Sequence, residues 1–243
     1  MFFGTYGYGA NEEIIPEFAD APDIDGELGD EWDVSNRTDI YFEGLNGILR
    51  VMQDNTNLYI SIEFDLDPSA RNETEFIAIL ISNSSSDSPE DFVDAKVVRF
   101  SNLSEGNFAY LDCYVDNYNI KHNDTNMDFD GNGAAEMYDY DTIVYEFSMP
   151  YGNTDDNDDA FLEYGNKYAF NITYGDWNLY PGGITKSHCV LITIQTPLPP
   201  EINLTEIVLF ILSIVSFSCI GAFLAIYSYK IIVLKKKIGR LLG

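Results

Sequence analysis

The sequence predicts an all-β domain, folded as an antiparallel β-sandwich of the immunoglobulin-like or jelly-roll-like kind, followed by a single transmembrane α-helix. Three observations support this. Segments of period-two hydrophobicity recur between turn-rich stretches. No amphipathic helix of more than two turns is evident among them. The segment Ile207–Tyr229 contains no charged residue. With 243 residues, of which 46% are hydrophobic, the chain is suited to one folded domain with an appendage.

The expected strands are separated by turn residues. Leu58, Ile60, Ile62 and Phe64 alternate with polar residues, and the segment forms a hairpin with 48–53 around the turn 54–57. The segment 76–81 is apolar on both faces, which is typical of a central strand. The other expected strands are Lys96–Phe100, Phe108–Val115, Ile143–Met149, Lys167–Tyr174 and Val190–Gln195. This number of short strands indicates a sandwich.

The apolar segment Ile207–Tyr229 is long enough to cross a bilayer. As a helix its 23 residues span about 34 Å, and a core helix is rarely apolar all round for so long. The cluster Lys235–Lys237 follows, so the positive-inside rule places the C-terminus in the cytoplasm. The expected organisation is an extracellular sandwich (14–196), a proline-rich stalk (197–206), the membrane helix (207–229) and a basic cytoplasmic tail (230–243).

The N-terminal segment 1–13 carries no evident signal peptide. It has neither a basic start nor a long apolar stretch, which an exported N-terminus needs. The competing topology is a tail-anchored protein with its large domain in the cytosol. The lysines after the span and the glycosylation motifs oppose it.

The charge is unevenly distributed. The net charge is −27, all 40 acidic residues lie at or before Glu206, and five of the 13 basic residues follow it. Such an acidic domain repels phosphate backbones, which excludes nucleic-acid binding. Two histidines and three cysteines exclude zinc-cluster and disulfide-scaffold classes. Cys113 and Cys189 form either a disulfide or two buried thiols, and Cys219 lies in the span.

Glycosylation motifs fit an extracellular location. Seven Asn-x-Ser/Thr motifs occur where the composition gives about two by chance. The acceptors are Asn36, Asn72, Asn83, Asn102, Asn123, Asn171 and Asn203. On the strand 167–174, Asn171 and Thr173 share a face that we expect to be solvated.

Four motifs in order resemble the DOMON-like group that includes family 9 carbohydrate-binding modules. They are Asp23-Ile24-Asp25-Gly26 with Glu31-Trp32, the strand 57–62 (NLYISI), the strand 145–150 (YEFSMP) and Gly175-Asp176-Trp177. The resemblance covers about residues 20–196. It implies a β-sandwich that binds sugars, haem or other ligands outside the cytoplasm. We expect Trp32 to pack against the sandwich rather than to stack on a ligand.

The segment 128–139 matches a twelve-residue calcium loop. Its expected ligands are Asp128, Asp130, Asn132, Ala134 (through its carbonyl), Glu136 and Asp139, with Asp141 in reserve. Oxygen ligands at these positions, with Gly133 for the tight turn, favour Ca²⁺. The flanks do not look helical, so we expect a calcium-stabilised loop in a β-protein. The alternative is a solvated acidic turn.

Trp177 and Tyr180 are the candidate ligand-binding residues. Together with Pro181-Gly182-Gly183 they form an aromatic loop, and sugar rings stack on exposed aromatic faces. The alternative is a loop whose Trp folds back on the core. The second acidic cluster, 153–159, is expected to be a solvated hairpin loop. Known enzyme motifs are absent from the sequence, so no catalytic residues are assigned.

These observations favour a single-pass cell-surface protein that binds ligand, with glycans as the leading class, and carries structural calcium. A structural coat or adhesion protein without a small ligand is the second hypothesis, since acidity and glycosylation fit it equally well. A haem-carrying electron-transfer module is the third. Met52, His122 and His188 could serve as haem ligands, but no spacing motif supports them.

Overall fold

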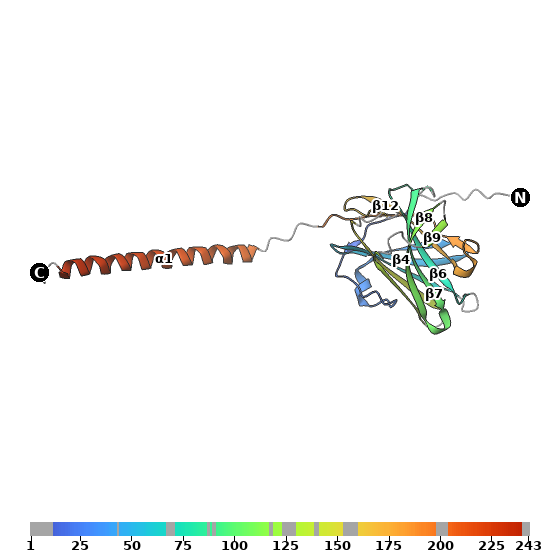
Figure 1. The fold of residues 1–243 in the computed structure, drawn as a ribbon, viewed down its shortest axis with the longest axis horizontal. Coiled ribbons are helices and arrows are strands. Elements are labelled where there is room, and N and C mark those ends of the chain that lie inside the picture. Colours follow the sequence, from blue (N-terminus) through green and yellow to red (C-terminus); the bar gives the residue numbers. More distant parts are fainter. Residues whose placement is uncertain are drawn as a thin grey trace. The chain divides into compact units, whose positions relative to one another are not determined.

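The computed structural model describes residues 12–42, 44–66, 71–86, 88, 91–116, 119–122, 130–138, 141–152, 160–197 and 204–239. The chain divides into two compact units, Met1–Pro197 and Leu198–Gly243. The first unit is a β-sandwich and the second contains one long helix (Figure 1).

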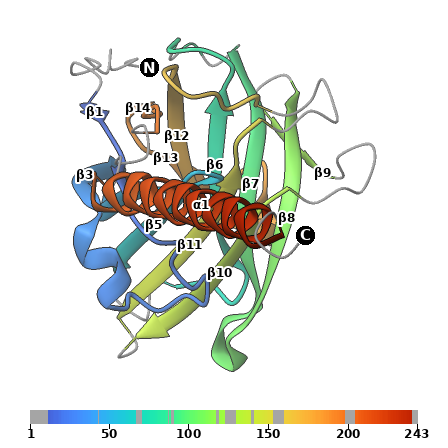
Figure 2. The ribbon, with the colours of Figure 1, turned by 90° about the vertical axis from the view of Figure 1, so that its left-hand side faces the viewer.

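Two mostly antiparallel sheets form the sandwich (Figure 2). Sheet A has the order β1 (Glu12–Ile14), β14 (Val190–Thr193), β12 (Lys167–Asp176), β6 (Glu75–Ser82), β7 (Phe92–Asn102), β8 (Asn107–Asp116) and β9 (Asn119–His122), and β13 (Ile184–Lys186) pairs with β12. Sheet B has the order β10 (Asn132–Tyr138), β11 (Thr142–Pro150), β5 (Asn57–Asp65), β4 (Leu45–Gln53) and β2 (Glu17–Phe18), and β3 (Asn36–Phe42) pairs with β4. The pairs β1–β14 and β2–β4 are parallel.

The main core lies between the two sheets. Alternate residues of each strand enter it, as the period-two pattern predicts, and Ile60 and Ile62 of β5 share it with Ile77 and Ile79 of β6. Around Tyr145 the aromatic rings of Phe64 and Phe100 pack edge to face. The predicted β-sandwich fold is therefore confirmed.

A second apolar cluster covers the outer face of sheet A. It includes Phe76 and Ala78 of β6, Val97 of β7 and Ala169 of β12. Because β6 is thus buried on both faces, it is apolar from Phe76 to Ile81, as the prediction of a central strand requires.

The prediction of a solvated face around Asn171 is wrong. Thr173 is 1% exposed, and the Asn171 side-chain amide donates to the carbonyl of Ser187 at 2.7 Å. The segment after β13 continues beside β12, where the backbone N–H of Ser187 donates to the carbonyl of Ile172, and the outer apolar cluster covers this face. The alternation of side chains along β12 shows which residues share a face of the strand, but it does not show which face other segments cover.

The segment 19–34 covers part of the outer face of sheet B. It ends in a short 3₁₀ helix, Asp30–Val34, whose Trp32 packs on Met52 and Tyr59. Trp32 is 3% exposed, so the predicted packing role is confirmed.

Gly26 fixes the path of this covering segment. Its φ is +93°, and a Cβ there would lie 2.5 Å from the backbone carbonyl carbon of Ala135. The backbone N–H groups of Gly26 and Asp25 donate to one carboxylate oxygen of Glu146, at 2.7 and 3.0 Å. The Asp-Gly pair of the opening motif thus docks the segment against β10 and β11.

All eight expected strands are present, with shifted ends, and β11 ends at Pro150, which lacks a backbone N–H. The sequence analysis missed β3 and β10 and the short strands β1, β2, β9 and β13. β3 (NRTDIYF) is rich in polar residues because it pairs only with β4. β10 (NGAAEMY) has a weak strand composition, and its pairing with β11 stabilises it.

The helix α1 spans Leu204–Gly239, which is 36 residues. It exceeds the expected 207–229 because the lysines that follow are good helix formers. Its portion Val208–Ile238 is long and apolar enough to cross a membrane, and its side chains are exposed in this structure. The prediction of one long apolar C-terminal helix is confirmed.

Candidate functional site

A cleft of about 770 Å³ lies where the β4–β5 turn meets the segment that follows β11. Strand pairing brings these parts together, since Asn57 at the start of β5 is opposite Pro150 at the end of β11. Loops at one end of a sandwich are a common place for binding sites. The described lining residues are Asn55, Thr56, Asn57, Pro150, Tyr151, Gly152, Phe161, Leu162, Glu163, Tyr164 and Asn166.

The turn that forms one side of the cleft is stabilised by Asp54. Its carboxylate accepts from the backbone N–H groups of Thr56 and Asn57, at 2.5 and 2.7 Å, and from the Tyr59 hydroxyl at 2.9 Å. Burial alone would raise the pKa of Asp54, but these hydrogen bonds hold it below its ordinary value. The turn is thus preorganised as an Asx-type structure.

The other side of the cleft is aromatic. The rings of Tyr151 and Tyr164 lie with centroids 5.0 Å apart, inclined by 56°. Phe161 is 42% exposed and Tyr164 is 36% exposed. The Tyr164 hydroxyl donates to the backbone carbonyl of Asn55, which joins the aromatic side to the turn. The cleft therefore exposes apolar ring surface to solvent, and a hydrogen bond to the turn fixes the position of Tyr164.

Hydrogen bonds hold the aromatic segment in place. The backbone N–H of Tyr151 donates to Thr56 at 2.8 Å, and that of Gly152 donates to Leu162 at 2.9 Å. The Tyr151 hydroxyl is buried without a hydrogen-bond partner among the described residues, and burial raises the pKa of this phenol. A buried hydroxyl of this kind is available to a ligand or to water.

Amide and carboxylate groups complete the lining. The Asn166 side chain donates to the Glu163 carboxylate at 3.0 Å, and the Asn57 side chain donates to Thr56 and Tyr59. Aromatic surface next to amide donors and a carboxylate acceptor suits a neutral polyhydroxylated ring.

The predicted residues Trp177 and Tyr180 lie elsewhere, on the outer face of sheet A. Their rings stack on each other, with centroids 5.7 Å apart, and both pack edge-on against Phe76. The Arg99 guanidinium lies 5.1 Å from the centre of the Trp177 ring. The Tyr180 hydroxyl accepts from the backbone N–H of Ile120. The structure brings the pair together, half-buried, with much of the ring surface used in packing.

The predicted calcium loop is only partly within the described residues. Asp128 and Asp139 lie outside them. Asn132, Ala134 and Glu136 lie on β10, so the expectation of a loop at these positions is wrong, because pairing with β11 extends the chain. Asp130, just before the strand, donates its backbone N–H to Asp112 at 2.7 Å. Among the residues that the structure covers, no group of three or more His, Cys, Asp or Glu is arranged as metal ligands. Calcium binding stays a prediction.

The other candidate residues are dispersed over the domain. Asn72 and Asn83 are exposed, Asn36 and Asn102 are half-exposed, and Asn123 and Asn203 lie outside the described residues. Glycosylation of these sites stays a prediction.

The candidate haem ligands are not brought together in the described part of the domain. Met52 is buried under Trp32, and His188 packs against Tyr41. The side chain of His122 is not among those described. Cys113 and Cys189 are buried thiols in the outer cluster of sheet A, not a disulfide.

The comparison with protein-family models finds no match, and neither does the comparison with curated proteins. Solved structures do match. A family 9 carbohydrate-binding module from Caldicellulosiruptor kristjanssonii, bound to cellotriose, is 13% identical, with a TM-score of 0.48 over 79% of this chain and 97% of that one. The glucose complex of such a module from the same organism gives 14% identity, a TM-score of 0.48, and coverage of 79% and 100%.

The sandwich is similar to family 9 carbohydrate-binding modules. A putative carbohydrate-binding protein from Bacteroides uniformis ATCC 8492 is also similar, at 8% identity and a TM-score of 0.44 over 78% of this chain and 94% of that one. The family 9 modules belong to the group that the sequence motifs resemble.

The aromatic residues of the cleft were not predicted from the sequence. Tyr151, Phe161 and Tyr164 flank the acidic segment 153–159, which was interpreted as a solvated loop. A usable signal was present: three aromatic residues beside Gly152 and Gly165 in a turn-rich stretch. Their convergence with the β4–β5 turn depends on strand pairing and cannot be read from spacing.

Proposed function

We propose that the sandwich domain binds carbohydrate in the cleft lined by Tyr151, Phe161 and Tyr164, and that α1 anchors the chain in a membrane. The observation that carries the proposal is the exposed aromatic surface of Phe161 and Tyr164 beside amide and carboxylate groups. Sugar rings present apolar C–H faces and polar edges, and this lining matches both.

The size and openness of the cleft support a small saccharide. Its volume of about 770 Å³ lies within the range of small-molecule sites, roughly 300–1,000 Å³. The β4–β5 turn and the Tyr164–Asn55 hydrogen bond fix the two sides of the cleft in the absence of ligand. A preorganised site loses less conformational entropy on binding.

The membrane role of α1 rests on its length, its composition and the charges at its end. Val208–Ile238 exceeds the roughly 20 residues that a bilayer core requires. By the positive-inside rule, Lys235, Lys236 and Lys237 would lie on the cytoplasmic side, which supports an extracellular position for the sandwich. Protease treatment of intact cells should therefore digest the sandwich; protection until the cells are lysed would refute this orientation.

The cleft is tested by calorimetric titration of the full chain in detergent with cellotriose and glucose, the ligands named for the solved modules, followed by a glycan array. Phe161→Ala should weaken binding about tenfold, because loss of a stacked ring costs about 1.4 kcal/mol. Phe108→Ala is the matched control, because Phe108 is 40% exposed on β8 and lies outside the cleft.

A third variant, Trp177→Ala, separates the cleft from the sequence-predicted surface. Unchanged affinity in Trp177→Ala together with loss in Phe161→Ala supports the cleft. Loss in Trp177→Ala alone would reject the cleft and move the site to the outer face of sheet A.

A further inference from the structure

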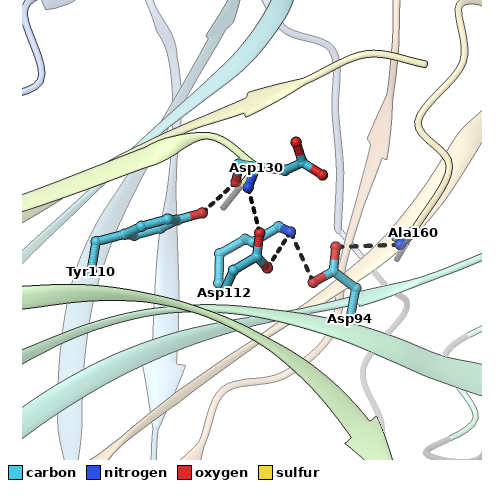
Figure 3. Close-up of polar contacts among 6 residues, drawn as sticks. Asp94, Tyr110, Asp112, Asp130 and Ala160 are labelled. Atoms are coloured by element: carbon cyan, nitrogen blue, oxygen red, sulfur yellow. Dashed lines mark hydrogen bonds and ion pairs between the residues drawn. The ribbon is translucent and has the colours of Figure 1, made fainter. Parts of the chain in front are cut away.

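Sheet A carries a charged cluster on the face that points between the two sheets. Asp94, Lys96 and Asp112 are 2%, 3% and 3% exposed. Figure 3 shows Asp94 and Asp112 within this cluster. They occupy positions of β7 and β8 that alternate with the outer-face residues Ala95, Val97 and Cys113. Lysine is almost never buried to this degree unless it is paired.

The lysine and one aspartate are in direct contact across the ladder. Lys96 on β7 is directly opposite Asp112 on β8, and its Nζ lies 2.5 Å from Oδ1 of Asp112. The second carboxylate, Asp94, lies 3.3 Å from the same Nζ. An amine and a carboxyl group are thus held in contact in a region that bulk water does not reach.

Neighbouring backbone groups fix both carboxylates. Oδ2 of Asp112 accepts from the backbone N–H of Asp130 at 2.7 Å, and Oδ2 of Asp94 accepts from that of Ala160 at 3.3 Å. The Tyr110 hydroxyl donates to the carbonyl of Asp130 at 2.6 Å and so braces the residue that holds Asp112 (Figure 3).

We propose that Lys96 and Asp112 become joined by an intramolecular isopeptide bond. A proton passes from the Lys96 ammonium group to a neighbouring carboxylate, and the Nζ lone pair attacks Cγ of Asp112. The C–N bond forms, one C–O bond of the carboxyl group breaks, and the oxygen leaves as water with two protons that came from Nζ and the protonated carboxyl group. The reaction consumes no oxidant, nucleotide or other co-reactant.

Burial supplies the driving force for this condensation. Desolvated charges are costly in a protein interior, and an amide removes one positive and one negative charge from it. Desolvation opposes the charge on Lys96, but the neighbouring carboxylates raise the pKa of Lys96 above its ordinary value, so Nζ must first give a proton to a carboxylate. Because the two groups are held in contact, the reaction is also effectively unimolecular.

The surroundings assign separate roles to the other groups. The Asp130 N–H points at the Asp112 carboxyl group, where negative charge develops on oxygen during attack. Asp94 is placed to take a proton from Nζ and to return it to the leaving oxygen. A cavity of about 10 Å³ borders Asp94, Lys96 and Asp130, and this is about the room that one water molecule needs.

Asp112 is the acceptor rather than Asp94 for two reasons. Its oxygen is closer to Nζ, and it lies on the neighbouring strand, so the bond ties β7 to β8. A bond within β7 would give no such link between strands. The expected consequence is a hairpin whose register persists in denaturant.

The test is tryptic peptide mapping of the wild-type full chain by tandem mass spectrometry. The linked peptides should be lighter by the mass of one water than the sum of the two, and cleavage after Lys96 should be lost because its amine is acylated. Quantitative cleavage after Lys96, with both peptides at their unmodified masses, would overturn the proposal. Fragments that place the link on Asp94 would also overturn the assignment.

Two variants check the roles. Asp112→Ala should restore cleavage after Lys96 completely. Asp94→Asn keeps the shape of the side chain, and it should reduce the linked fraction at least tenfold while circular dichroism stays unchanged. An undiminished linked fraction in folded Asp94→Asn would remove the proton-transfer role. Since the main readout uses the wild-type chain, a variant that fails to fold leaves that test in force.

Discussion

Replacing Glu146 by glutamine should remove a pH-dependent loss of stability from the sandwich. Glu146 is fully buried on the outer face of sheet B, under the segment that Gly26 docks. Burial raises the pKa of Glu146 from about 4.5 to about 7, although the N–H groups of Gly26 and Asp25 oppose this rise.

The direction of this pH dependence follows from which state, folded or unfolded, retains the proton of Glu146. Below pH 4.5 the carboxyl group is neutral in both the folded and the unfolded chain. Between pH 4.5 and 7 the unfolded chain releases the proton while folded Glu146 retains it, so the free energy of unfolding decreases as the pH rises. Above pH 7 both states are ionised and the loss is complete. At about 1.4 kcal/mol for each pH unit, the loss approaches ~3 kcal/mol.

The assay is urea denaturation of the full chain at several pH values from 4.5 to 8, followed by tryptophan fluorescence. We expect wild type to lose about 3 kcal/mol relative to Glu146→Gln across this range. Glu105→Gln, in the exposed turn between β7 and β8, is the control and should follow the wild-type curve. Parallel curves for wild type and Glu146→Gln would refute the reasoning.

Further predictions concern the docking glycine, glycosylation and calcium. Gly26→Ala should destabilise the domain by at least ~2 kcal/mol, measured by denaturation, because its Cβ would meet the β10 backbone. The control is Gly106→Ala, which is also at positive φ but in open space and should cost only about 1 kcal/mol. Equal losses of stability in the two variants would contradict the clash at Gly26. Mass spectrometry of glycopeptides should find sugar on Asn72 and Asn83, which are exposed, and none on Asn171, whose amide is engaged; an occupied Asn171 contradicts this. If the calcium ion predicted from the sequence is bound, chelation should lower the melting temperature of the domain. An unchanged melting temperature would contradict a structural calcium ion.

The candidate site shows how far sequence patterns reach. The Trp177–Tyr180 pair is conspicuous in the sequence, but both rings pack against Phe76, because the outer face of sheet A is apolar and needs covering. Phe161 and Tyr164 are inconspicuous in the sequence beside an acidic segment, and strand pairing leaves them exposed in a cleft. Exposure of a ring depends on what lies above it, and local spacing carries no information about that.

The strands show the same division. Alternation identified β5 and the apolar run identified β6, because local side-chain periodicity reflects burial directly. β10 was not predicted because its alanines and glycine have low strand propensity, and only pairing with β11 makes it extended.

By itself the sequence determined the sandwich class, the positions of the main strands along the chain and the long apolar C-terminal helix. These follow from the periodicity and length of apolar segments, which are properties of neighbouring residues. Only the tertiary structure decided that Lys96 meets Asp112 inside the sandwich, that Gly26 and Glu146 dock the covering segment, and that Tyr164 reaches the β4–β5 turn. Each of these contacts depends on strand register and on which sheet face is covered, and both are set by the packing of segments far apart in the chain.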